Sequence, residues 1–222
     1  MPANDKIQVE IWSDVMCPFC YIGKRQFEAA LDRFEGRDRV EIIWKSYQLD
    51  PKLKAPGGQS IYEYLAHKKG MSVEQSQNLH DRVTQSAAQV GLDYRFDRVV
   101  VNNSHAAHRL IQLAKTRGLG DAVEEALFRA YFTEGKDIGD RATLAALAAE
   151  IGLDAESAAQ AFDDPQGEWR KRVDDEASEA LAFGSNGVPF FVFHRQYAVT
   201  GAQGEEVFHR VLEKVTRENP LP

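Results

Sequence analysis

The chain has 222 residues, of which 43% are apolar and 27% charged, and its formal net charge is −7 at pH 7. This length suits one large domain or two small ones, and the apolar content excludes an intrinsically disordered chain. The acidic charge argues against a nucleic-acid partner, because binding a phosphate backbone needs a surplus of Lys and Arg. The apolar stretches are short and the first residues lack a signal-peptide pattern, so we expect no membrane partner and a cytoplasmic location.

The two ends of the chain carry strand patterns. Residues 7–11 alternate apolar and polar side chains, which predicts a strand with one buried face. A helix follows from residue 20 to Gly36, and residues 40–49 predict a second strand. Near the other end, residues 190–193 and 197–200 predict two further strands, and a helix occupies the region of residues 207–215. The ends therefore predict βαβ and ββα units that share one sheet.

The segment between these ends is predicted to be helical throughout. Its candidate helices lie near residues 60–69, 73–90, 104–117, 121–132, 141–151, 154–162 and 167–183. No strand pattern and no repeat interrupts them. We therefore predict a discontinuous α/β domain, residues 1–55 and 184–222, with an inserted helical domain, residues 56–183.

The only two cysteines, Cys17 and Cys20, stand where the first strand runs into the first helix. Unpaired N–H groups and the helix dipole favour an anion there, so Cys17 is the predicted nucleophile and the more exposed thiol. Cys20, one turn later, is the predicted resolving thiol. The pattern favours thiol–disulfide exchange through a mixed disulfide. The alternatives are a chance pair of buried cysteines and a metal site with His105 and His108; we expect no metal, because two cysteines cannot complete a structural zinc site.

Six short motifs occur in order along the chain. They are DVMCPFCYIG (residues 14–23), NSHAAHRL (103–110), LFRAYFTEG (127–135), DIGD (137–140), GVPFFV (187–192) and GAQ (201–203). Together they resemble the DsbA-like branch of the thioredoxin superfamily, and in particular its FrnE-like oxidoreductases, over nearly the whole chain. The resemblance implies an α/β thioredoxin fold with a large inserted all-helical domain.

The resemblance also implies a cis bond between Val188 and Pro189 that faces the cysteines, and this loop is the predicted contact for a substrate strand. Phe19 and Trp12 are predicted to form an apolar rim that contacts substrate, with a core position as the alternative for Trp12. Asp14 is predicted to orient the loop or relay protons, unless it is only a turn residue. Phe19 stands where periplasmic relatives commonly carry His, so we expect a redox potential in the middle of the roughly −270 to −120 mV range.

The predicted function is that of a protein or dithiol–disulfide oxidoreductase, with isomerase activity left open. Its expected partners are disulfide- or dithiol-containing proteins or small molecules. We expect no bound cofactor, and glutathione stays open as a co-substrate. The first alternative is a glutathione-dependent isomerase or kappa-type glutathione transferase, whose members typically carry Ser at the position of Cys17. The second alternative is a peptide-binding chaperone. The sequence predicts neither the direction of electron flow nor the oligomeric state.

Overall fold

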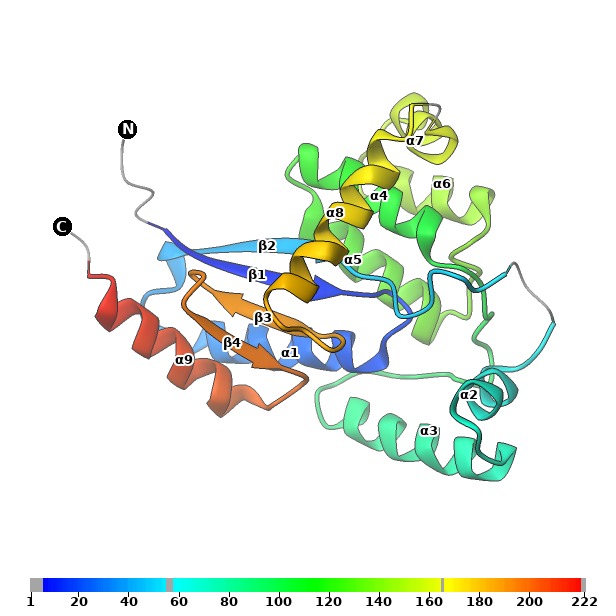
Figure 1. Cartoon of the computed structure of the whole chain (residues 1–222), viewed down its shortest axis with the longest axis horizontal. Coiled ribbons are helices and arrows are strands. Elements are labelled where there is room, and N and C mark those ends of the chain that lie inside the picture. Colours follow the sequence, from blue (N-terminus) through cyan, green and yellow to red (C-terminus); the bar gives the residue numbers. More distant parts are fainter. Residues whose placement is uncertain (1–5, 55–57, 165, 221–222) are drawn as a thin grey trace.

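The computed structural model describes residues 6–54, 58–164 and 166–220. In that part of the chain four strands form one sheet in the order β2-β1-β3-β4. The central strand β1 (Ile7–Ser13) pairs in parallel with β2 (Val40–Ser46) and antiparallel with β3 (Phe190–Phe193). Strand β4 (Tyr197–Thr200) completes the sheet antiparallel to β3. Strands from the two ends of the chain therefore lie side by side (Figure 1), as the sequence predicts.

Helices cover both faces of this sheet. On one face, α1 (Pro18–Asp32) packs against α9 (Glu205–Glu218), and on the other α8 (Glu168–Ala182) crosses β1 and β2 (Figure 1). Because successive side chains of a strand point to opposite faces, each face has its own apolar cluster. The α1/α9 cluster contains Ile7, Val9, Ile11, Phe27, Phe191, Phe193 and Phe208, and the α8 cluster contains Trp12, Ala180, Phe190 and Val192.

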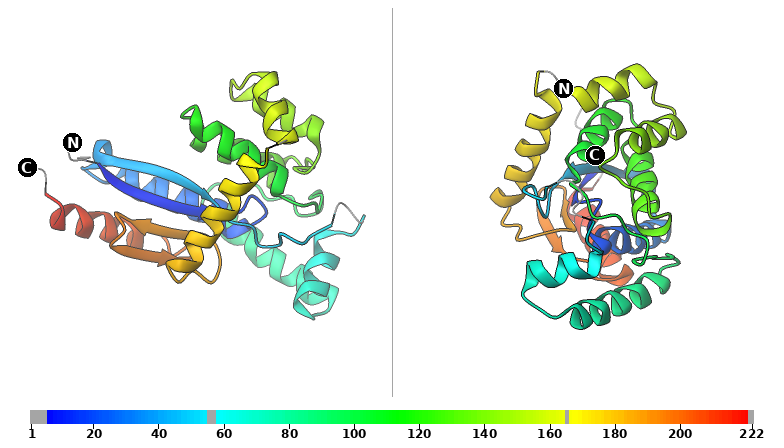
Figure 2. Two further views of the ribbon diagram at one scale, coloured as in Figure 1. Left: turned by 45° about the horizontal axis from the view of Figure 1, so that its top comes forward. Right: turned by 90° about the vertical axis from the view of Figure 1, so that its right-hand side faces the viewer.

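The remaining helices gather at the end of the sheet away from the two chain termini (Figure 2). They are α2 (Ile61–Lys69), α3 (Val73–Ala88), α4 (His105–Thr116), α5 (Gly120–Phe128), α6 (Arg141–Glu150) and α7 (Ala155–Asp163), with a 3₁₀ turn at Arg37–Arg39 and a π-helical turn at Arg129–Thr133. Their apolar side chains form one core together with the residues that join β1 to α1. This arrangement brings the helical segment against the two cysteines.

Two predicted element boundaries differ in the structure. The strand predicted over residues 40–49 ends at Ser46, because the Leu49 N–H donates to the Asp14 carboxylate instead of continuing the sheet. The helix predicted over residues 121–132 is divided, since α5 ends at Phe128 and continues as the π-helical turn. The predicted domain boundary between residues 55 and 56 lies outside the described residues.

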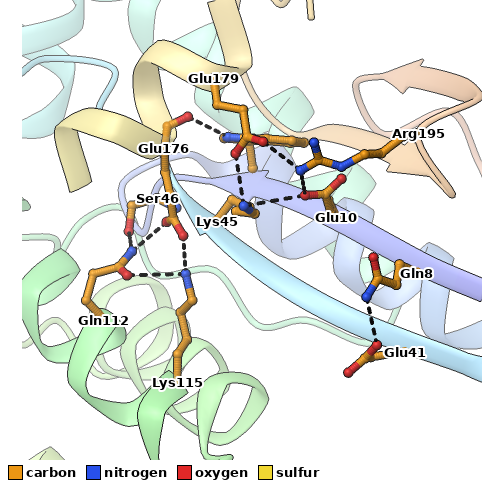
Figure 3. A network of polar contacts seen from close by, with 11 residues as sticks. Gln8, Glu10, Glu41, Lys45, Ser46, Gln112, Lys115, Glu176, Glu179 and Arg195 are labelled. Atoms are coloured by element: carbon orange, nitrogen blue, oxygen red, sulfur yellow. Dashed lines mark hydrogen bonds and ion pairs between the residues drawn. The ribbon is translucent and has the colours of Figure 1, made fainter. Parts of the chain in front are cut away.

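A polar network ties α8 to the sheet and to α4 (Figure 3). Glu176 accepts hydrogen bonds from the Ser46 backbone N–H (2.7 Å) and from Gln112 Nε2 (2.5 Å), and it forms an ion pair with Lys115. Glu179, one turn further along α8, pairs with Lys45 of β2 (2.9 Å). Side chains of the helical segment are therefore fixed to the sheet by charge as well as by apolar packing.

Candidate active site

Cys17 lies at the junction between β1 and α1. Strand β1 ends at Ser13 and α1 begins at Pro18, so Cys17 is the N-cap residue, with extended backbone (φ −90°, ψ 111°). Its N–H donates to the Asp14 carbonyl oxygen (2.9 Å), and its own carbonyl accepts from the Cys20 N–H (3.0 Å). The structure thus has Cys17 at a helix N-terminus and Cys20 one turn later, where the sequence predicts them.

Both thiols are free and almost fully buried. The exposed fraction is 3% for Cys17 and 2% for Cys20. The predicted difference in exposure amounts to only one percentage point, because the Val188 carbonyl accepts from Cys17 Sγ (3.4 Å) and Tyr94 lies close to both sulfurs. Burial raises the pKa of the Cys20 thiol well above its ordinary value, and the neighbouring Cys17 raises it further. Cys20 is therefore held as a neutral thiol.

The loop before β3 lies directly beside Cys17. Its Val188–Pro189 peptide bond is cis, and the Val188 carbonyl oxygen is the group that contacts the Cys17 sulfur. The Pro189 carbonyl accepts a hydrogen bond from the Gly201 N–H (2.8 Å), which holds the loop against β4. Residues 171 positions apart in the sequence thus meet at the sulfur.

The two aromatic residues of the predicted rim have different environments. Phe19 is 45% exposed, so it can contact a bound molecule. Trp12 is fully buried, and its indole N–H donates to the Glu176 carbonyl oxygen of α8 (2.7 Å). The prediction that Trp12 contacts substrate is therefore wrong. It follows Ile11, whose side chain faces α1 and α9, so the alternation of the strand turns Trp12 toward α8.

Asp14 is fully buried and organises the loop before Cys17. Its Oδ1 accepts from the Met16 N–H (3.2 Å), and its Oδ2 accepts from the Leu49 N–H (2.7 Å). His108 of α4, also fully buried, places Nε2 3.3 Å from Oδ1. Of the two roles predicted for Asp14, the structure supports that of orienting the loop. The sequence gives no sign of the contact with His108, because 94 positions separate the two residues.

Two further residues that contact the junction of β1 and α1 are not among the predicted site residues. The Tyr94 hydroxyl donates to the Pro18 carbonyl oxygen in the first turn of α1 (2.7 Å). Glu124 of α5 is fully buried, and its Oε2 accepts from the Ser13 hydroxyl (3.5 Å). Burial raises the pKa of Glu124 to about 8. Nothing in the sequence separates Glu124 from its neighbour Glu125, since only tertiary packing decides which of the two is buried.

Within residues 6–54, 58–164 and 166–220, no three or more His, Cys, Asp or Glu side chains are grouped so that they could hold a metal ion. His108 is paired with Asp14, and His105 is half-buried, with its pKa lowered chiefly by burial. In the same ranges, no helix is both long enough and apolar enough to cross a membrane.

Comparisons with known proteins cover almost the whole chain. The probable DsbA oxidoreductase SCO1869 from Streptomyces coelicolor is 40% identical in sequence to this chain. Its crystal structure matches with a TM-score of 0.90 over 97% of this chain and 92% of that one. The uncharacterized protein YwbO of Bacillus subtilis (strain 168) is 28% identical over 212 residues, which are 93% of this chain and 96% of that protein. The cytosolic disulfide reductase DsbM from Pseudomonas aeruginosa shares the fold at 21% identity, with a TM-score of 0.68 over 95% and 99% of the two chains.

These likenesses confirm the predicted fold class, a mixed α/β thioredoxin-like sheet with many inserted helices. The sequence profile of the DSBA-like thioredoxin domain matches residues 8–213, which include both cysteines and the loop before β3. We conclude that the chain belongs to the family of DSBA-like thioredoxin domains.

Proposed function

We propose that this protein is a thiol–disulfide oxidoreductase of the FrnE-like kind, acting on disulfides or dithiols of proteins or small molecules. The observation that carries the proposal is the asymmetry of the cysteine pair. Both thiols are buried, but Cys17 is the N-cap residue of α1, whereas Cys20, one turn later, has a raised pKa. The 40% identity to a probable DsbA oxidoreductase supports the same class of activity.

The proposed chemistry is exchange through a mixed disulfide. In the reductive direction, the Cys17 thiolate attacks one sulfur of a substrate disulfide and releases the other sulfur as a thiolate. Cys20 then loses its proton and attacks the Cys17 sulfur, which closes the Cys17–Cys20 disulfide and releases the second substrate thiolate. Two electrons pass to the substrate. Two molecules of glutathione, oxidised to glutathione disulfide, restore the dithiol, and the same steps in reverse oxidise a substrate.

The loop before β3 is the proposed contact for the substrate backbone. Val188 lies against Cys17, so an extended substrate whose sulfur reaches Cys17 passes along Val188 and Pro189. Phe19, exposed in the first turn of α1, is the proposed apolar contact. These proposed contacts all belong to the proposed α/β domain, residues 1–55 and 184–222, which also carries the cysteines. The proposed helical domain, residues 56–183, covers them.

The proposed chemistry uses no bound cofactor, and the proposed compartment is the cytoplasm. A chain whose only cysteines form one reactive pair carries no further disulfide to stabilise it in an oxidising compartment. Glutathione, the main thiol of a reducing compartment, is the proposed co-substrate.

The proposal is tested by insulin reduction and by reactivation of scrambled ribonuclease, with the wild type, Cys17→Ser and Cys20→Ser proteins. We expect activity in the wild type alone. Cys20→Ser should accumulate a mixed disulfide with glutathione at Cys17, detectable by mass spectrometry, because the resolving thiol is missing. Iodoacetamide should label Cys17 of the reduced wild type before Cys20, because burial raises the pKa of Cys20.

Equal activity of the wild type and Cys17→Ser would overturn the proposal. Glutathione binding without disulfide turnover would support the glutathione-dependent isomerase or transferase instead. Suppression of aggregation that survives in the Cys17→Ser/Cys20→Ser protein, together with no disulfide turnover in the wild type, would support the chaperone.

A further inference from the structure

The side chains proposed to contact a substrate carry no charge. Phe19 is 45% exposed in the first turn of α1, and Val188 lies against the Cys17 sulfur. Leu49, whose N–H donates to the Asp14 carboxylate, is also apolar and is 43% exposed. Selection among substrates by charge therefore depends on the segments that adjoin these residues.

The loop after β2 is held against the residues that lead to Cys17 (Figure 1). The Tyr47 N–H donates to the Ser13 carbonyl oxygen (3.0 Å). The Leu49 N–H donates to the Asp14 carboxylate (2.7 Å), and the Asp14 carbonyl oxygen accepts from the Cys17 N–H (2.9 Å). Side chains of this loop are therefore presented close to the reactive sulfur.

This loop and the helix α2 that follows it are basic, although the whole chain has a net charge of −7. Residues 47–71 contain four lysines and two carboxylates, which give a net charge of +2 with histidine neutral. All four lysines are exposed. They are named here the lysine cluster and consist of Lys52, Lys54, Lys68 and Lys69.

Both carboxylates of this segment already have partners. Asp50 pairs with Lys68 (2.9 Å), and Glu63 forms the capping box of α2 with Ser60. An exposed ion pair leaves little net charge to act on a ligand. Within the described residues, no ion pair is formed by the other three lysines, Lys52, Lys54 and Lys69.

The loop that carries the first two lysines is fixed in place. The side-chain amide of Asn103 donates to the carbonyl oxygens of Pro51 (3.3 Å) and Leu53 (2.8 Å). Leu53 packs against the apolar core of the helical segment, and the lysines on either side of it, Lys52 and Lys54, are exposed. Their charges are therefore held at a defined place beside the site.

The other charged segment near the cysteines is neutral overall. The Tyr94 hydroxyl donates to a carbonyl oxygen in the first turn of α1 (2.7 Å), and residues 93–98 around it contain two arginines and two aspartates. Arg95 and Arg98 both face Asp97, at 3.5 and 3.9 Å. This segment therefore adds no net charge beside the site, and the lysine cluster supplies the positive one.

We propose that the lysine cluster selects substrates whose disulfide lies in an acidic peptide segment. An extended peptide advances about 3.3 Å per residue, so carboxylates a few residues from the substrate cysteine come opposite the loop after β2. Their attraction to the lysines raises the rate of encounter, and the exchange of bonds at Cys17 is unchanged. The inference rests on the proposed function and narrows its substrate class.

The test compares three peptide disulfides that differ only in the residues around the cysteine. Each is the oxidised homodimer of a short peptide in which one cysteine is flanked by Glu, Gln or Lys. Acid quenching and chromatography give the rate at which the reduced protein releases the peptide thiol. Each rate is divided by the rate of the same peptide with dithiothreitol, a neutral dithiol, which corrects for effects of the flanking residues on the disulfide itself. The measurements are made at low salt and in about 1 M NaCl, where the Debye length is about 3 Å.

Four proteins are compared. They are the wild type, Lys52→Gln/Lys54→Gln, Lys52→Glu/Lys54→Glu and Lys171→Gln/Lys214→Gln. The last is the matched control, because it removes the same charge from two exposed lysines of α8 and α9. Circular dichroism verifies that each variant is folded.

In the wild type at low salt we expect the Glu peptide to react about tenfold faster than the Lys peptide. This ratio falls toward one in about 1 M NaCl, because salt screens exposed charges. Lys52→Gln/Lys54→Gln lowers the ratio to about threefold, and Lys52→Glu/Lys54→Glu reverses the order of the two peptides. The control keeps the wild-type ratio, and the Gln peptide reacts equally fast with all four proteins.

Equal corrected rates for the Glu and Lys peptides in the wild type would overturn the inference. So would a preference that both variants at Lys52 and Lys54 retain, or one that the control loses to the same extent. If Lys52→Gln/Lys54→Gln reduces oxidised glutathione more slowly but keeps the preference among peptides, the lysines recognise glutathione and the inference fails.

The three peptides also distinguish this failure from that of the proposed function. If the wild type reduces none of them, the proposed function fails. If it reduces all three at equal corrected rates, the proposed function stands and only the role of the lysine cluster fails.

Discussion

Solvent exposure divides the side chains around the cysteines into two groups. Phe19 is 45% exposed, and Leu49, whose backbone is fixed by Asp14, is 43% exposed. Asp14 and Glu124 are fully buried. When a ligand covers an exposed apolar side chain at the reactive site, the complex is stabilised. A buried polar side chain instead acts on the sulfur or on the loop that carries it. Substitutions in the two groups should therefore affect different properties.

We expect Phe19→Ala to weaken exchange with peptide disulfides and to leave the fold unchanged. Covering about half of a Phe side chain contributes on the order of 1 kcal/mol, or about fivefold in the rate constant. Because Phe19 is half exposed, the free energy of unfolding should change by less than about 0.5 kcal/mol. The measurement compares the rate of exchange with a peptide disulfide and with oxidised glutathione, alongside urea denaturation.

The control for Phe19 is Leu181→Ala. Leu181 is 61% exposed on α8, which covers the opposite face of the sheet from α1. This variant should exchange with both disulfides at wild-type rates. An equal decrease in the rate of exchange with the peptide disulfide in Phe19→Ala and Leu181→Ala would mean that Phe19 forms no specific contact with the substrate.

The buried Glu124 predicts how stability depends on pH. Its pKa of about 8 in the folded protein is above the value of about 4.3 for an unperturbed glutamate. Between these values the folded state binds a proton that the unfolded state releases, so stability falls as the pH rises, by up to about 1.4 kcal/mol per pH unit. This contribution is fully present below the lower value and is lost as the pH rises through about 8. Urea denaturation at several pH values should show that the free energy of unfolding falls less steeply with pH in Glu124→Gln than in the wild type. An unchanged dependence on pH would mean that Glu124 is charged in the folded protein.

At the scale of whole elements, the close approach of α1 to the loop before β3 keeps the cysteines beside Val188. Gly23 is the residue of α1 at this contact. A Cβ at Gly23 would lie 3.2 Å from Pro189 Cγ and 3.4 Å from Phe191 Cζ. Both neighbours are rigid and belong to the loop and to the strand that follows it. The spacing between α1 and the loop therefore depends on the absence of a side chain at Gly23.

We expect Gly23→Ala to slow exchange more than it changes stability. The added methyl group improves helix propensity by about 1 kcal/mol, but overpacking costs about 1–3 kcal/mol. The net loss of stability should thus be at most about 2 kcal/mol, while the displaced Pro189 shifts Val188 relative to Cys17. Insulin reduction and urea denaturation measure the two effects.

Gly120→Ala is the matched control for Gly23→Ala. A Cβ at Gly120, at the start of α5, would lie 3.3 Å from Cγ of Lys115, so this substitution crowds its neighbour about as closely as Gly23→Ala does, but at a contact that includes neither Pro189 nor Phe191. This variant should keep wild-type exchange, whatever its effect on stability. A Gly23→Ala protein that gains stability and exchanges normally would contradict the account of this contact.

At the scale of the whole molecule, α8 joins the sheet to the helices that cover the cysteines. Glu176 contributes most of the polar contacts, to Ser46, Gln112 and Lys115 (Figure 3). Its backbone carbonyl oxygen also accepts from Trp12 Nε1. Removing one partner from a buried set of charge-assisted hydrogen bonds leaves the remaining polar groups unsatisfied. The resulting loss of stability exceeds the stability that the intact contacts contribute. The position of α8 should therefore be sensitive to this one residue.

We expect Glu176→Gln to destabilise the protein by about 2–4 kcal/mol, because the amide N–H₂ would replace one carboxylate oxygen and face either Lys115 or the two donors from Ser46 and Gln112. Asp175→Asn, the neighbouring position, changes an exposed carboxylate paired with Lys171 four residues away and should cost less than about 0.5 kcal/mol. Urea denaturation monitored by tryptophan fluorescence compares the two, since Trp12 contacts Glu176. Equal and small decreases in the free energy of unfolding of both variants would show that apolar packing alone holds α8 in place.

The sequence by itself determined the elements of this protein and the place of its cysteine pair. Alternation of apolar residues and helical spacing are local properties, so strands and helices follow from neighbouring residues. The junction of β1 and α1 is local in the same way, and Cys17 and Cys20 belong to it. Element boundaries were less well predicted where a distant group intervenes, as at residue 46, where β2 ends because Asp14 binds the following loop.

Only the tertiary structure decided which side chains surround the two sulfurs. Trp12 is buried because α8 covers the face of β1 to which it points, and no residue near Trp12 in the sequence shows this. Glu124 and Glu125 are adjacent residues of the same type. Glu124 is buried and accepts from the Ser13 hydroxyl, whereas Glu125 pairs with Arg25. The physical reason is that burial and hydrogen bonding depend on contacts between distant segments, whereas sequence patterns report only on neighbours along the chain.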